Sequence, residues 1–233
     1  MRIADLRPGW DTDFILHRFG AEIEHRQPAS RNVAIGVAAA WDGRALKEWT
    51  ADGVKLVQTR MLQLVPGSLR APVRAARGST AVRRLDLAAE AEALYDLEGT
   101  DADAFEPESY RAYLRLQGAR YRSMEAAGLL HWFGLFCDGH LAATCGLMRS
   151  AAAPGASARF QRVVTHPAYR RRGLCSALVN AVGRFALGQW GAGAVYMAAE
   201  PEDVAIGIYR TIGWHDLSSA YGLQRNAPED RGT

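Results

Sequence analysis

Residues 163–176 place a strand, a basic turn and the start of a helix next to one another. A helix N-terminus exposes backbone N–H groups without an intrahelical partner and the positive end of the helix dipole, which together bind phosphate. Gly173 has no Cβ, so the backbone can approach a ligand closely, and Arg170, Arg171 and Arg172 add charged donors. The segment therefore predicts a cradle for a diphosphate. The alternative is a solvated basic turn before an amphipathic helix.

Hydrophobic periodicity predicts the elements that position this cradle. Asp138 and Gly139 separate two apolar runs and form the strongest short hairpin signal in the chain. We expect strands at residues 82–87, 131–137, 140–148, 159–165, 194–199 and 221–225, and helices at residues 88–97, 109–127, 171–189 and 202–212. This order predicts an α/β fold with a mixed, mostly antiparallel central sheet flanked by helices.

A stretch rich in Pro, Gly, Ser and Arg at residues 66–80 indicates a soft boundary. It divides the chain into an N-terminal extension, residues 1–79, and a second part, residues 80–233. The extension is expected to be small and α+β, with strands at residues 13–19, 32–37 and 54–59 and a helix at residues 44–49. No chemistry can be attached to it from its motifs, and a degenerate second copy of the main domain is one interpretation.

Composition narrows the class of protein. The chain has 233 residues, of which 48% are hydrophobic and 23% charged, with a net charge of +3, which excludes a disordered chain and a coiled-coil rod. No apolar run reaches the length of a membrane span, and the N-terminus shows no secretory pattern, so we expect a cytoplasmic protein that binds no membrane. Because the net charge is small, we expect no nucleic-acid partner. Cys137 and His140 together provide too few ligands for a metal site, so we expect no metal.

The pattern Arg170-x-x-Gly173-x-Cys175 resembles the Q/R-x-x-G-x-G/A signature of the GNAT superfamily, the acetyl-CoA-dependent N-acetyltransferases. A second segment, Ile208-Tyr209-Arg210-Thr211-Ile212-Gly213-Trp214, is similar to the late Leu-Tyr-x-x-x-Gly-Phe pattern of that family. The resemblance covers roughly residues 80–226. Cys175 departs from the usual Gly or Ala, and Glu202 stands where many members have asparagine.

The resemblance implies acetyl-CoA as the acyl donor. It places the pantetheine chain along the strand residues Val163, Val164 and Thr165, with the Val164 N–H at the oxyanion, and with Glu202 near the pantetheine. It places the diphosphate on the loop and helix start formed by Arg170, Arg171, Arg172, Gly173, Leu174, Cys175 and Ser176. Tyr209 falls on the family's tyrosine, which implies contact with the coenzyme and a role as general acid, because a phenol can protonate a thiolate leaving group. The alternative for Tyr209 is a core residue.

The general base stays open at this point. Gln161 stands where many members have glutamate and cannot take a proton, which leaves Glu200, His166 or a water relay. In the family the early helices shape the acceptor site, so Tyr113, Gln117 and Tyr121, together with Gln161, are the candidate acceptor-binding residues.

The resulting hypothesis is an N-acyltransferase that moves an acetyl or other short acyl group from acyl-CoA to an unidentified primary amine within a ternary complex. The alternative is a non-catalytic acyl-CoA-binding module. An arginine-rich nucleic-acid binder is the least favoured class, and a homodimer is left open.

Overall fold

The computed structural model describes residues 2–3, 17, 33–37, 54–100, 107–150 and 157–225. The chain divides into two compact units. One is Leu62–Asp216, and the other consists of Met1–Met61 together with Leu217–Thr233. The site described below lies within the first of these units.

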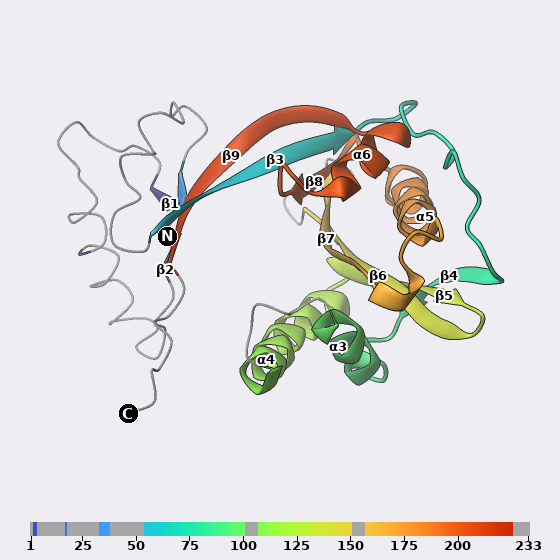
Figure 1. The fold of residues 1–233 in the computed structure, drawn as a ribbon, viewed down its shortest axis with the longest axis horizontal. Coiled ribbons are helices and arrows are strands. Elements are labelled where there is room, and N and C mark those ends of the chain that lie inside the picture. Colours follow the sequence, from blue (N-terminus) through green and yellow to red (C-terminus); the bar gives the residue numbers. More distant parts are fainter. Residues whose placement is uncertain are drawn as a thin grey trace. The chain divides into compact units, whose positions relative to one another are not determined.

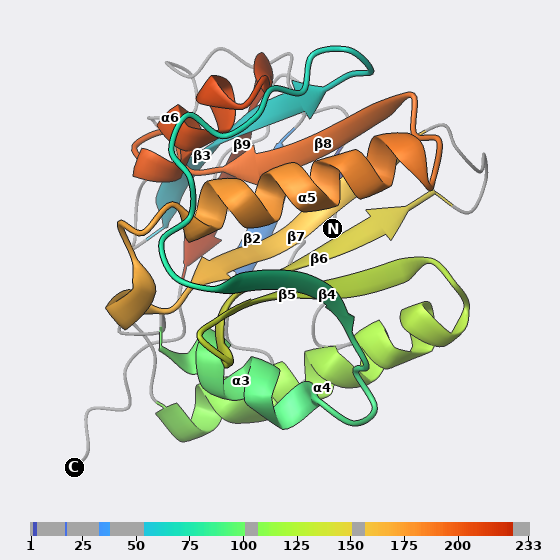
Figure 2. The ribbon, with the colours of Figure 1, turned by 90° about the vertical axis from the view of Figure 1, so that its right-hand side faces the viewer.

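The unit Leu62–Asp216 is built on a mixed sheet. Its strands lie in the order β8-β7-β6-β5-β4, with the end of β3 (Lys55–Leu64) beside β8 (Figure 2). They are β4 (Thr80–Leu85), β5 (Leu130–Cys137), β6 (His140–Arg149), β7 (Ser157–Thr165) and β8 (Ala194–Ala199). Neighbours from β4 to β7 are antiparallel, whereas β7 and β8 are parallel. The predicted mixed, mostly antiparallel sheet is confirmed.

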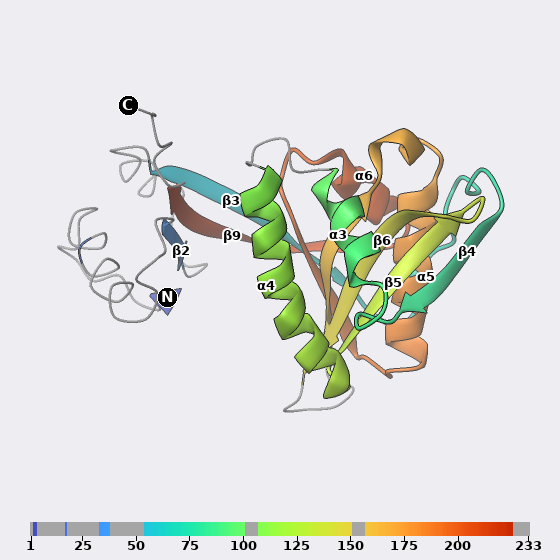
Figure 3. The same ribbon diagram turned by 90° about the horizontal axis from the view of Figure 1, so that it is seen from below.

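Helices cover both faces of this sheet (Figures 1 and 3). α3 (Ala91–Gly99) and α4 (Pro107–Ala126) lie on one face, and α5 (Leu174–Gly188) with α6 (Val204–Thr211) lies on the other. Each face has its own apolar core. Leu178, Val182 and Trp214 belong to the core under α5 and α6, and Leu114 and Trp132 belong to the core under α3 and α4. The structure therefore has two separate faces on which a site can be built.

Local signals explain where these elements begin and end. Asp138 and Gly139 both adopt positive φ angles, of 50° and 84°, as a tight two-residue hairpin turn requires. α5 begins at Leu174, three residues later than predicted, because Arg171 and Gly173 adopt left-handed φ angles of 63° and 78°. α6 begins at Val204 because the Asp203 carboxylate accepts a hydrogen bond from the Ala205 N–H at 2.8 Å and caps the helix.

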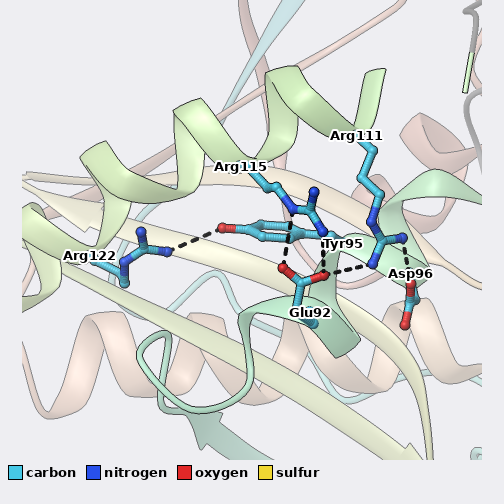
Figure 4. A network of polar contacts seen from close by, with 6 residues as sticks. All are labelled: Glu92, Tyr95, Asp96, Arg111, Arg115 and Arg122. Atoms are coloured by element: carbon cyan, nitrogen blue, oxygen red, sulfur yellow. Dashed lines mark hydrogen bonds and ion pairs between the residues drawn. The ribbon is translucent and has the colours of Figure 1, made fainter. Parts of the chain in front are cut away.

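α3 and α4 are held side by side by charged contacts and close packing (Figure 4). Arg111 of α4 forms ion pairs with Glu92 and Asp96 of α3, each at 2.7 Å. Gly118 of α4 lies against the hydroxyl of Tyr95, and a Cβ added at Gly118 would meet that oxygen at 1.7 Å. The exposed ion pairs stabilise little on their own, but the close packing fixes how the two helices sit on the sheet.

Residues 66–79 hydrogen-bond within the unit Leu62–Asp216. The Arg70 N–H donates to the Ile212 carbonyl at 3.0 Å, and the Arg77 N–H donates to the Arg172 carbonyl at 2.9 Å. The side-chain amide of Asn180 donates to the Arg70 carbonyl at 2.6 Å. The segment that the sequence predicts to be a boundary therefore contacts the start of α5 and the end of α6 directly.

In the other unit, β1 (Arg2–Ile3) runs parallel to β2 (Val33–Val37), and β2 pairs antiparallel with β9 (His215–Arg225). The strands predicted at residues 32–37 and 54–59 are present as β2 and β3 (Lys55–Leu64). The strand predicted at residues 13–19 and the helix predicted at residues 44–49 lie outside the described residues, apart from His17. Across the described part of the chain, every helix is too short or too polar to span a bilayer.

Candidate functional site

The two parallel strands separate before they end. β7 pairs with β8 only through Ser157, Ala158 and Arg159, although β7 continues to Thr165 and β8 to Ala199. On its other side, β7 carries a bulge. Thr144 pairs with Val164 and Gly146 with Gln161, so two residues of β7, 162 and 163, stand opposite one residue of β6. The last part of β7 is thus free of ladder pairing on the β8 side.

The turn after β7 is held by its own side chains. The His166 Nδ1 accepts a hydrogen bond from the Ala168 N–H at 3.2 Å and caps the short 3₁₀ helix η1 (Pro167–Tyr169). The Arg170 Nε donates to the Thr165 carbonyl at 3.1 Å. The guanidinium of Arg172 lies 5.0 Å from the centre of the Tyr169 ring. These contacts fix the approach of the chain to α5, and they give His166 a structural role.

Gly173 forms the N-cap of α5 and offers no side chain to cap it. Its φ angle of 78° suits glycine, and an added Cβ would lie 3.2 Å from the Ala75 carbonyl oxygen. Since the cap lacks a side-chain acceptor, the first-turn N–H groups of α5 are available to an anion. The predicted diphosphate cradle therefore has the local geometry that it requires.

A cavity of about 430 Å³ opens between the end of β7, the start of α5 and α6. It is lined by Val163, Thr165, Tyr169, Arg170, Arg171, Gly173, Leu174, Cys175, Ser176, Asp203, Val204, Ala205, Ile208 and Tyr209. Most of the residues predicted to bind the coenzyme thus meet in one cavity. Val164, Arg172 and Glu202 are outside its lining: Val164 is buried, and the other two are exposed.

Tyr209 lies at the inner end of this lining and is 4% exposed. The Tyr209 hydroxyl and the Cys175 thiol both belong to the cavity lining and lie close enough to affect each other's pKa. Burial raises the pKa of the Tyr209 phenol well above its usual value, and it raises the pKa of the Cys175 thiol to about 11. Tyr209 therefore keeps its proton at neutral pH and lies near a sulfur atom, whereas Cys175 is a poor nucleophile.

The structure does not bring Glu200 into the cavity. It follows the last residue of β8, is exposed, and is absent from the lining residues. Its assignment as general base stays a prediction without support from the geometry. Sequence reasoning also missed Asp203, which caps α6 and lines the cavity next to the predicted Glu202. The N-cap position before an apolar run was the signal that could have identified it.

Of the predicted acceptor-binding residues, Tyr113, Gln117 and Tyr121 belong to α4, on the other face of the sheet, and Gln161 belongs to β7. The Gln117 Nε2 donates to the Tyr113 hydroxyl at 2.8 Å. The Tyr121 ring lies 5.0 Å from the Trp132 ring, centre to centre. A Cβ at Gly146 would touch both Trp132 and the Cβ of Gln161, which places Gln161 beside the same tryptophan. Within the described residues, no group of three or more His, Cys, Asp or Glu side chains could hold a metal ion.

The unit Leu62–Asp216 is an α/β sandwich in which two parallel strands separate beside an uncapped helix start. This combination is typical of acyltransferase folds. The model of the acetyltransferase (GNAT) family matches residues 91–214, which is more than half of the chain. The protein belongs to the acetyltransferase (GNAT) family. The resemblance found from the two sequence motifs is confirmed.

Solved structures support the same fold. A conserved protein of unknown function from Staphylococcus epidermidis matches with a TM-score of 0.75 at 10% identity, over 97% of this chain and 84% of that one. A GCN5-related N-acetyltransferase from Kribbella flavida matches with a TM-score of 0.59 at 21% identity, over 94% and 75%. A tandem GNAT protein from the clavulanic acid biosynthesis pathway matches with a TM-score of 0.62 at 17% identity, over 98% and 76%. A comparison with curated proteins finds no match.

Proposed function

We propose that the protein is an N-acyltransferase that moves an acetyl or other short acyl group from acyl-CoA to a primary amine in a ternary complex. The observation that carries this proposal is one cavity that joins the uncapped start of α5, the end of β7 where pairing with β8 has ceased, and the buried Tyr209. Family membership supplies the general reaction, acyl transfer from acyl-CoA.

The donor would bind through main-chain groups. The diphosphate would accept hydrogen bonds from the N–H groups at the start of α5, with Arg170 and Arg171 supplying positive charge at the cavity wall. The acyl-pantetheine arm would lie along residues 163–165, where β7 has left β8. A backbone N–H in this segment would stabilise the oxyanion of the tetrahedral intermediate. The family resemblance names the N–H of Val164, whereas the structure pairs Val164 with Thr144 on β6 and places Val163 and Thr165 in the cavity lining.

The thiolate of coenzyme A must be protonated as it leaves, and Tyr209 is the residue that can do so. The effect of the Cys175 thiol on the pKa of the Tyr209 phenol supports this role, because it places the phenol near a sulfur atom in the cavity lining. Its burial keeps it protonated until the reaction produces a strong base beside it. The proposal also includes a cytoplasmic location. The proposed partner besides acyl-CoA is an amine acceptor, not a nucleic acid or a membrane.

A substitution of Tyr209 tests the enzyme against the alternative, a non-catalytic acyl-CoA-binding module. We expect Tyr209→Phe to lower kcat about 100-fold, because it removes a general acid, while acetyl-CoA binds as before. The measurement is acetyl-CoA-dependent thiol release with a panel of primary amines. Tyr196→Phe is the matched control, since the Tyr196 hydroxyl accepts a hydrogen bond from Gln63 on β3 and Tyr196 does not line the cavity.

The outcomes separate the two functions. If Tyr209→Phe turns over an established acceptor as fast as Tyr196→Phe does, the role of Tyr209 as acid is wrong. If the parent protein binds acetyl-CoA but releases no thiol with any amine of the panel, the binding module replaces the enzyme.

A further inference from the structure

A buried ion pair lies at the β7 bulge, on the face covered by α3 and α4. Arg162 adopts a positive φ of 46°, and its Nε lies 2.7 Å from Oε2 of Glu98 in the last turn of α3. Its Nη2 donates to the hydroxyl of Tyr110 on α4 at 2.5 Å. Only 3% of the Glu98 side chain and 23% of the Arg162 side chain is exposed. Three elements therefore converge on one buried carboxylate.

The hydrogen-bond capacity of this cluster is not filled by the described part of the chain. Oε1 of Glu98 is buried without a partner, and so is Oε1 of Gln117, whose Nε2 donates to Tyr113. Unfilled buried acceptors are costly, and burial raises the pKa of the Glu98 carboxyl to about 7 against the opposing effect of Arg162. On the same face, Nε1 of Trp132 and Nε of Arg162 also lack a hydrogen bond, although the Arg162 Nε takes part in the ion pair with Glu98. The two unfilled oxygens of Glu98 and Gln117 are acceptors, and a ligand that completes them is one that donates N–H or O–H groups.

The ion pair and the coenzyme cavity meet at one point of β7. Arg162 is bonded to Val163, which lines the cavity, and consecutive Cα atoms are about 3.8 Å apart. At the bulge, the Arg162 side chain reaches Glu98 on α3, on one face of the sheet. The next residue, Val163, lines the cavity on the other face. β7 has already stopped pairing with β8 there. A group bound beside Glu98 is therefore next to the strand segment that would hold the thioester.

We propose that Glu98 is the base that deprotonates the acceptor, and that the acceptor is a small primary amine with an aromatic or apolar body. This inference rests on the proposed acyltransferase function. A primary ammonium supplies the donors that the free oxygens of Glu98 and Gln117 lack. Tyr110, Tyr113 and Tyr121 supply aromatic surface on the same face, which suits both a cation and an apolar body.

The proton balance of the step is as follows. One N–H bond of the ammonium breaks, and its proton passes to Oε1 of Glu98, which later releases it to water. The nitrogen lone pair forms the new C–N bond at the thioester carbonyl, and the C–S bond breaks as the sulfur leaves with its electron pair. Tyr209 gives its proton to that sulfur and regains one from the positively charged nitrogen of the tetrahedral intermediate, which thereby becomes the neutral amide nitrogen. Nothing is oxidised or reduced.

The groups around Glu98 allow its titration to be recognised. Arg162 faces it from β7, and Tyr110 and Tyr121 face the pair from α4, with Arg159 of β7 acting on Tyr121. Glu98 and its neighbours raise the pKa of Arg162 despite burial, and burial raises the pKa of Tyr121. These two groups titrate far above neutrality. An activity limb close to pH 7 would consequently report on Glu98.

The test uses 2-phenylethylamine as acceptor probe, with acetyl-CoA, on the full chain. We expect Glu98→Gln to lower kcat/KM about 100-fold or more and to abolish the limb near pH 7, with acetyl-CoA affinity unchanged. Glu125→Gln is the matched control, because Glu125 is a partly buried glutamate on the neighbouring helix, α4, and accepts a hydrogen bond from the Leu87 N–H. Glu98→Asp is a second variant that keeps a carboxyl group, and we expect it to retain a shifted limb.

Three results would overturn the inference. Equal kcat/KM and an unchanged pH profile in Glu98→Gln and Glu125→Gln would remove Glu98 as base. A parent protein that binds acetyl-CoA but does not acetylate 2-phenylethylamine at millimolar concentration would remove the proposed acceptor class while leaving the acyltransferase proposal in place. A parent protein that does not bind acetyl-CoA would overturn the proposed function itself and this inference with it.

Discussion

The two faces of the sheet in the unit Leu62–Asp216 are built in different ways. The face under α5 and α6 offers main-chain groups to a ligand: the uncapped helix start at Gly173 and the residues of β7 that no longer pair with β8. The face under α3 and α4 relies on side chains, with Glu98, Arg162 and Tyr110 brought together from three elements. Under the proposed function, main-chain groups would bind the acyl donor that the family shares, and side chains, which can be exchanged, would select the acceptor.

This difference has a consequence for how each face responds to pH. Backbone N–H groups do not titrate, so the cradle at α5 should bind an anion equally well across the neutral range. The other face contains a buried carboxyl group whose pKa is raised to about 7. We therefore expect the pH dependence of activity near neutrality to arise on the face under α3 and α4 alone.

The largest effect on stability follows from Glu98. Because its folded pKa is raised above the unfolded value near 4.5, its contribution is fully present below about pH 4.5 and is lost as the pH rises through about 7. The free energy of unfolding of the parent, relative to Glu98→Gln, should therefore fall by about 3 kcal/mol between these pH values. Denaturant unfolding of both proteins at a series of pH values measures this. A pH-independent difference would show that Glu98 titrates normally.

A smaller effect is expected on the other face, from the cap of α6. Asp203→Ala removes the acceptor for the Ala205 N–H and should lower the free energy of unfolding by about 1 kcal/mol. The adjacent exposed Glu202→Ala is the matched control and should change little. Thermal unfolding of the two variants gives the comparison, and equal losses would contradict the capping role.

The sequence predicted the first face better than the second for a physical reason. The cradle at residues 170–176 is continuous in the chain, and the helix periodicity that follows it is strong, so motif and element support each other. The hairpin at Asp138 and Gly139 is equally local, since two positive φ angles there need only those two residues. The one error in this region, the early start expected for α5, arose because a left-handed φ at Arg171 cannot be read from an arginine.

The face under α3 and α4 could be predicted only in part. Tyr113, Gln117 and Tyr121 could be named as candidate acceptor-binding residues because they share one stripe of a single helix. Glu98 and Arg162 were not, because they are 64 residues apart and each looks like an ordinary charged residue in its own element. The bulge that turns Arg162 toward Glu98 depends on the register between β6 and β7. Nothing in the sequence indicates that register, so the pairing of Arg162 with Glu98 could not be predicted.

We propose that the main-chain cradle at α5 binds acetyl-CoA. Calorimetric titration of the protein with acetyl-CoA tests this binding most directly. We expect micromolar binding by the parent. Gly173→Glu should abolish it, because a side chain at a φ of 78° is strained and its carboxylate repels the diphosphate. Gly188→Glu, at the other end of α5 with open space around it, should bind as the parent does. Absence of binding by the parent at millimolar acetyl-CoA, or equal binding by Gly173→Glu, would contradict the account.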